Sequence, residues 1–109
     1  MAVIAAQSVP VIGAEIVWSN AAAGGDEVPV GNGRILLVRN GHTAAQTATL
    51  ATPGTARGLA IEDPSKAITA NGGIWSVPLV DEYRNGVGRA TLTYSAVTAL
   101  QVAVLEPAR

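Results

Sequence analysis

Residues 23–41, AGGDEVPVGNGRILLVRNG, constrain the fold of this chain more than any other segment. A loop rich in Gly, Asp, Pro and Asn runs into the short apolar run 34–39, which ends at Asn40-Gly41. Turn-forming residues that bracket short aliphatic runs are typical of small all-β domains. The stretch contains no recognisable set of catalytic groups. It therefore indicates a structural building block rather than an enzyme.

Other segments also have the pattern of strands. In residues 89–94 one face carries Arg, Thr and Thr, and the other carries Ala90, Leu92 and Tyr94. Further strands are predicted at residues 14–18, 46–52, 58–62, 67–69, 74–80 and 100–105, with turns at 52–55 and 63–65 and a hairpin-type turn at 71–73. No segment keeps helical apolar spacing for three turns. We predict an all-β fold, a β-sandwich or jelly-roll-like barrel of about seven to eight short antiparallel strands.

Two parts are predicted, an N-terminal arm over residues 1–12 and a single β domain over residues 13–109. The arm is uncharged and apolar and is interrupted by Pro10. It lies either on its own domain or on a neighbouring subunit, by addition of a strand to an open sheet edge. It lacks the basic start of a signal peptide, and no apolar run approaches the ~18 residues that a membrane-spanning helix needs.

The composition favours a surface that is partly covered by neighbours. Hydrophobic residues make up 49% of the chain, and charged residues only 14% against roughly 25% in an ordinary globular domain. The alternative is a monomer with an alanine-rich surface. A net charge of −1 argues against nucleic-acid or anionic-membrane binding. The absence of cysteine excludes disulfides and thiolate chemistry, and it suits a protein made in a reducing cytoplasm.

The candidate catalytic residues do not form a site. Three acidic pairs, Asp26-Glu27, Glu62-Asp63 and Asp81-Glu82, lie beside turn residues, and neighbours on an extended chain point to opposite faces. His42 is the only histidine and follows a turn glycine, and no serine lies in a G-x-S-x-G motif. Gly31-Asn32-Gly33 lacks the third glycine and the following helix of a dinucleotide-binding loop. We therefore predict no enzyme activity, no metal and no cofactor.

The four aromatic residues have two interpretations. Trp18, Trp75, Tyr83 and Tyr94 could provide a flat platform for sugar rings. Tyr94, however, falls on the apolar face of its strand and is assigned to the core. Trp18 lies just before a loop and Trp75 just after a turn, so each is predicted to anchor an interface.

Three blocks of the sequence resemble small head-decoration, or minor capsid, proteins of tailed bacteriophages. The first is AAGGD at residues 22–26, followed by NGR at 32–34 and a strand that ends in VRNG at 38–41. The second is TATLATPGT at 47–55 with GLA at 58–60, and the third is VGRATLTY at 87–94 with SAVT at 95–98. Together these blocks cover roughly half of the chain. Similar proteins often have Phe where this chain has Val28-Pro29-Val30.

The resemblance implies a virion structural protein on the outer capsid surface, made in the cytoplasm of a bacterial host. Its expected partners are the major capsid protein and further copies of itself, in a trimer or another ring. The predicted interface residues are Val3, Ile4, Trp18, Asp26, Glu27, Val28, Val30 and Trp75. The alternatives are a carbohydrate-binding, adhesin-type module, a tail or neck β module, and a small hydrolase that uses His42.

Overall fold

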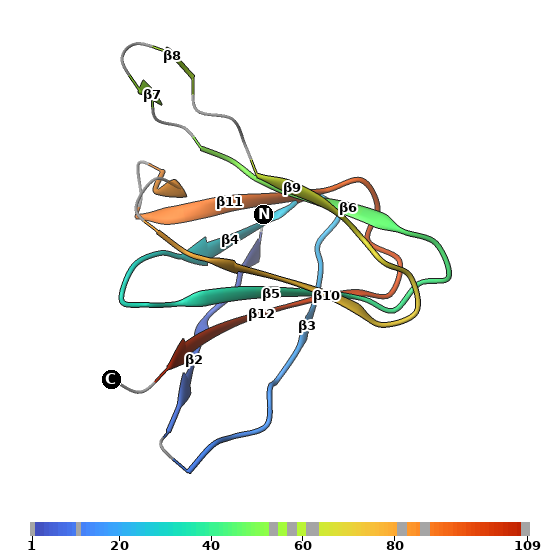
Figure 1. The fold of residues 1–109 in the computed structure, drawn as a ribbon, viewed down its shortest axis with the longest axis horizontal. Coiled ribbons are helices and arrows are strands. Elements are labelled where there is room, and N and C mark those ends of the chain that lie inside the picture. The colour runs from blue at the N-terminus through green and yellow to red at the C-terminus, as the bar shows by residue number, and fades with distance from the viewer. Residues whose placement is uncertain are drawn as a thin grey trace.

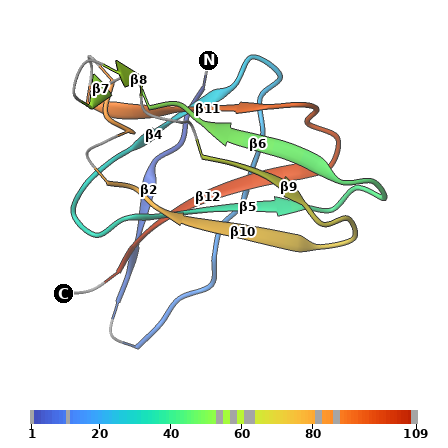
Figure 2. The ribbon, with the colours of Figure 1, turned by 45° about the horizontal axis from the view of Figure 1, so that its top comes forward.

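The computed structural model describes residues 2–10, 12–52, 55–56, 59–60, 64–80, 83–85 and 88–107. The regular elements of this part are strands, arranged in two five-stranded sheets and a separate two-stranded ribbon (Figures 1 and 2). The first sheet has the order β1 (Ala2–Val3), β4 (Asp26–Pro29), β11 (Arg89–Tyr94), β6 (Gln46–Leu50), β9 (Ser65–Ile68). The second has the order β10 (Gly73–Pro78), β5 (Ile35–Asn40), β12 (Leu100–Pro107), β2 (Ala6–Val9), and β3 (Ser19–Asn20) also pairs with β12. The ribbon consists of β7 (Thr55–Ala56) and β8 (Leu59–Ala60).

The two five-stranded sheets form a β-sandwich, which confirms the all-β prediction. Alternate residues of β5, β6 and β11 are buried, as expected when one face of each strand packs against the opposite sheet. The largest fully buried apolar side chains are Leu36, Leu50, Ile68, Leu92 and Leu100, together with Val28, Val38, Val102 and Val104. Aliphatic side chains from both sheets therefore form the core, and Tyr94 packs against it as predicted.

The strand predictions are most accurate where apolar and polar residues alternate along the whole segment. The strand predicted at 89–94 coincides with β11, and those predicted around residues 35–40, 46–50, 74–78 and 100–105 are present with shifted ends. The strand predicted at 14–18 is wrong, because that segment is irregular and only Ser19–Asn20 pairs with β12. The segment assigned to a loop contains β4 instead, since pairing with β11 holds this short run in the sheet. The predicted turns at 52–55 and 63–65 and the strand at 58–62 lie partly outside the described residues.

Two strand pairs are parallel, which corrects the expectation of an entirely antiparallel fold. Both involve the N-terminal arm: β1 pairs with β4 in the first sheet, and β2 pairs with β12 in the second. Between them Ile4 donates its backbone N–H to the carbonyl of Glu27 at 2.8 Å, and its side chain enters the core. Residues 2–9 of the arm therefore lie on their own domain and add an edge strand to each sheet. With β4 and the β7–β8 ribbon, these additions give the described part twelve strand segments, above the predicted seven to eight.

The turn at residues 70–72 joins the two sheets, because β9 belongs to the first sheet and β10 to the second. The prediction of a hairpin here is therefore wrong. Asn71 and Gly72 have φ angles of 62° and 105°, in the left-handed region where glycine and asparagine are least strained. The backbone N–H of Gly73 donates to the carbonyl of Thr69 at 3.2 Å. A Cβ atom on residue 73 would lie 2.4 Å from that carbonyl oxygen, so the turn needs glycine there.

We therefore expect Gly73→Ala to lower the free energy of unfolding by about 1–3 kcal/mol, because the clash is with backbone that cannot rotate away. Thermal unfolding followed by circular dichroism would measure the loss. Gly24→Ala is the matched control, since a Cβ atom there meets no atom within 4 Å. Equal melting temperatures for the two variants would contradict the assignment.

Candidate functional site

Four of the predicted interface residues are interior and cannot offer their side chains to a partner. Asp26 and Val28 are completely buried on β4, and Val30 and Ile4 are at most 7% exposed. The prediction for these four is corrected: β4 lies between β1 and β11, so its inward-facing side chains fill the core. The glycine-rich sequence around β4 suggested an exposed loop, but strand pairing buries it.

The other four predicted residues lie nearer to the surface. Val3 is 53% exposed on the edge strand β1. Glu27 is half-buried and accepts a hydrogen bond from Asn85 Nδ2 at 2.9 Å. Its Oε1 also forms an ion pair with Arg89 Nη1 at 3.9 Å. Trp75 is half-buried and packs against the core, so it supports the sandwich from within. Trp18 is half-buried and does not belong to the core cluster.

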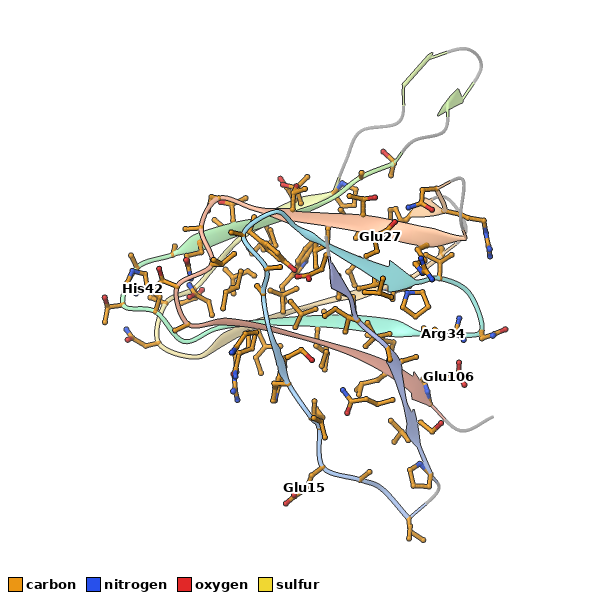
Figure 3. The ribbon with its side chains drawn as sticks, turned by 180° about the vertical axis from the view of Figure 1, so that it is seen from behind. Glu15, Glu27, Arg34, His42 and Glu106 are labelled. Carbon is orange, nitrogen blue, oxygen red and sulfur yellow. The ribbon has the colours of Figure 1, made fainter. Side chains whose placement is uncertain are left out.

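Among the described residues, the two most exposed large apolar side chains are those of Ile12, the last residue of the predicted arm, and Val17, in the segment predicted as a strand. We call residues 12–17 the β2–β3 loop. It projects beyond β2 and β3, away from the two sheets, and Glu15 lies on its outer part (Figures 1 and 3). Ile12 is 95%, Val17 69% and Ile16 39% exposed. The available signal is the run of aliphatic residues around Gly13, which the sequence analysis divides between the arm at residues 1–12 and a strand at residues 14–18.

Gln7 fixes the end of this loop. Its side-chain amide donates to the carbonyl of Val17 at 2.6 Å and accepts from the N–H of Val17 at 2.8 Å. A side-chain amide that pairs with both backbone groups of one residue replaces a short piece of strand pairing. The loop is therefore attached to β2 while the side chains of Ile12, Ile16 and Val17 face outward.

A concavity lined mainly by polar residues, here called the polar concavity, opens beside Arg39, whose guanidinium lies over the ring of Trp18. The Arg39 guanidinium carbon lies 4.7 Å from the centre of the Trp18 ring, and Arg39 Nη2 donates to Gln101 Oε1. Asn20, Asn71 and Gln101 line the same concavity, which has a volume of about 460 Å³. These contacts fix the guanidinium against an aromatic face in the cation–π arrangement.

Asp26, which is buried, and Tyr94, which is half-buried, form a polar pair between β4 and β11. The hydroxyl of Tyr94 donates to Asp26 Oδ2, which also accepts from the N–H of Ala22 at 3.2 Å. Burial raises the pKa of the Tyr94 phenol above its ordinary value, and the hydrogen bond to Asp26 and the charge on that carboxylate raise it further. The phenol therefore stays neutral in the folded protein and loses its proton more readily in the unfolded chain.

This shift predicts a loss of stability at alkaline pH. Because the pKa of Tyr94 is raised in the folded state, its contribution is complete below about pH 10, the ordinary pKa of tyrosine, and decreases above it by at most about 1.4 kcal/mol per pH unit. Urea unfolding between pH 8 and 11 should show a shallower decline for Tyr94→Phe, which has no phenol to titrate. Parallel declines in the two proteins would contradict this role for Tyr94.

At pH 7 we expect Tyr94→Phe to lower the free energy of unfolding by about 1–3 kcal/mol, because Asp26 loses the hydrogen-bond donor that Tyr94 provides.

A second buried polar cluster surrounds Asn40 at the end of the sandwich where His42 lies (Figure 3). Asn40 is completely buried, and its Nδ2 donates to the carbonyls of Ala44 and Ile68 at 2.9 and 3.0 Å. Its Oδ1 accepts from the N–H of His42 at 3.0 Å and from Gln46 Nε2 at 2.8 Å. Asn40 thus links β5 of the second sheet to β6 and β9 of the first.

The contacts of His42 in the structure are those of a turn residue. Its backbone N–H donates to Asn40 and its carbonyl accepts from the N–H of Asn71 at 2.8 Å. In the part of the chain that the structure describes, no three His, Asp or Glu side chains are grouped so that they could hold a metal ion. The acidic pairs 62–63 and 81–82 lie outside the described residues.

Arg34 and Glu106 form an ion pair at 2.8 Å between the start of β5 and the end of β12 (Figure 3).

The described residues include no helix long and apolar enough to cross a membrane. Comparison of the chain with protein-family models, with curated proteins and with solved structures finds no match.

Proposed function

We propose that this protein is an accessory structural protein of a tailed-bacteriophage head, which binds the outside of the capsid lattice and reinforces it. The observation that carries the proposal is the β2–β3 loop, an outward-facing apolar segment attached at its end to a rigid β-sandwich. The resemblance of three sequence blocks to head-decoration proteins supplies the partner, the major capsid protein.

The exposed side chains of the loop are suited to a protein surface. Burying an Ile or Val side chain contributes about 1.5–3 kcal/mol, so Ile12 and Val17 together could supply most of a modest contact. Glu15, the single charged residue among residues 1–25, lies between them in sequence and would set their orientation by pairing with a cation on the partner.

Reinforcement follows from repetition of such a contact. A copy that contacts two capsid subunits spans a seam that internal pressure tends to open. If copies also associate into a trimer or another ring, each contact raises the effective concentration of the next, and the whole set dissociates far more slowly than one contact alone.

The test of reinforcement uses mature heads that lack the protein. Heads are heated with increasing amounts of the purified protein, and DNA release is followed with an intercalating dye. We expect the temperature of DNA release to rise and then to reach a plateau as sites fill. An unchanged release temperature would overturn the proposal, and binding to isolated tails instead would favour a tail or neck component.

A further inference from the structure

The structure contains a second surface that capsid attachment does not use, the polar concavity beside Arg39. We propose that this concavity binds an acidic sugar unit, a hexuronate, with its carboxylate on Arg39 and its hydroxyl groups on neighbouring side-chain amides. The inference goes beyond the proposed function, because it concerns a ligand other than the capsid.

The first argument is the charge of Arg39. Among the described residues, Arg34 pairs with Glu106, and Arg89 lies 3.9 Å from Glu27. Arg39 is half-buried, yet in the same part of the chain its guanidinium contacts only the neutral Gln101 and the ring of Trp18. A partly desolvated guanidinium without a carboxylate has donors left to bind one, and its planar shape suits two parallel hydrogen bonds.

The second argument is the arrangement of amides around this cation. Asn20 comes from β3, Gln101 from β12 and Asn71 from the turn before β10, so three separate segments converge on one concavity. A side-chain amide offers both donors and acceptors, as a sugar hydroxyl requires. The volume of about 460 Å³ lies within the range of small-molecule sites. A carboxylate with adjacent hydroxyls therefore fits better than a bare anion.

The third argument is the rigidity of the walls. Ala99 has a φ of 51°, a strained conformation for a residue with a Cβ atom, and its carbonyl accepts the N–H of Gly41 at 3.0 Å. On the facing wall the N–H of Gly72 donates to the carbonyl of Asn40 at 2.7 Å. These bonds hold the turns that line the concavity in place before any ligand arrives, which reduces the entropy cost of binding.

The experiment titrates the ¹⁵N-labelled protein with sodium glucuronate and records backbone amide shifts. Glucose is the matched ligand control, because it has a CH₂OH group where glucuronate has a carboxylate. We expect saturable shifts at Gly41, Gly72 and Gln101, with glucose binding at least about tenfold more weakly, since a charge-assisted hydrogen bond contributes about 1.5–3 kcal/mol. Shifts that remain unsaturated at tens of millimolar glucuronate, or equal affinity for glucose, would overturn the proposal.

Variants separate the site from general effects of charge. Arg39→Gln should lose at least about tenfold in glucuronate affinity, whereas Arg34→Gln, which removes an arginine already paired with Glu106, should bind normally. Asn20→Ala, at an exposed position, should bind a few-fold more weakly and serves if Arg39→Gln unfolds. Equal binding by all three variants would refute the assignment.

One further ligand distinguishes a sugar acid from a peptide carboxylate. N-acetylglutamate amide carries the carboxylate without the ring hydroxyls, so we expect it to bind more weakly than glucuronate. Binding as tight as that of glucuronate would overturn the sugar part of the proposal and identify the site as a pocket for an acidic side chain. No phage head enters these titrations, so their failure would leave the proposed function untouched.

Discussion

Replacing Asn40 by leucine is expected to lower the free energy of unfolding by about 3–5 kcal/mol, although leucine has a similar shape and is more hydrophobic. The substitution removes four hydrogen bonds. It leaves the carbonyl of the buried Ile68 without its donor and takes an acceptor from Nε2 of the buried Gln46. Each such orphaned group costs about 1–3 kcal/mol. Because small domains are stable by only about 5–15 kcal/mol, this loss approaches the limit at which the fold survives.

The measurement is urea unfolding followed by circular dichroism at pH 7. Ser76→Ala is the control, since Ser76 is an exposed polar residue on β10 and its truncation should change stability by less than about 0.5 kcal/mol. A stability for Asn40→Leu close to that of the unmodified protein would show that the two sheets are held together by the apolar core alone.

Replacing Ile12 and Val17 together by serine is expected to weaken capsid binding by roughly 100-fold or more, with no loss of stability. The two side chains are 95% and 69% exposed, so the folded chain gains almost nothing from them. If the capsid surface buries them, their removal costs about 3 kcal/mol or more, which corresponds to that change in Kd. The hydrogen bonds between Gln7 and Val17 use the Val17 backbone and survive the substitution.

The matched control for the loop variant is Ile74→Ser. Ile74 is 56% exposed and lies on β10, at the opposite edge of the second sheet from β2. It should bind capsids as the unmodified protein does. If Ile74→Ser weakened binding as strongly as the loop variant, the effect would reflect general surface hydrophobicity, and the assignment of the β2–β3 loop would be wrong.

The parts of the fold that the sequence predicts are those with sustained alternation. In β11 the period of two assigns Ala90 and Leu92 to the core without knowledge of the partner strand, because this strand has one buried face. In β12 the same period assigns Leu100, Val102 and Val104 to the core, but Ala103 on the other face is buried as well. The all-β class follows from the same pattern and from the density of turn residues.

The elements that were missed depend on pairing between distant segments. The strand β4 contains an aspartate and a proline, a composition that is typical of a loop. It forms a strand because it pairs with β11, whose residues lie sixty or more positions further along the chain. For the same reason the sequence could not place the arm, whose parallel pairing with β4 and β12 is a long-range contact.

The sequence identified some site residues by their type, but it did not predict where they lie in the fold. The tryptophans were identified by type, but only the structure separates Trp75, which packs against the core, from Trp18, which stacks with Arg39. Asp26 was read as a loop carboxylate, although it accepts a hydrogen bond from Tyr94 inside the sandwich. The role of a polar residue in this chain depends on which strand lies opposite, and periodicity within one segment does not contain that information.

Co-sedimentation of the purified protein with mature, undecorated capsids tests the central claim most directly, with the mass of the free protein measured in parallel. We expect saturable binding at a fixed ratio to the major capsid protein, and the free mass then shows whether copies arrive singly or as a preformed ring. A protein that stays in the supernatant at every concentration would contradict its assignment as a capsid decoration protein.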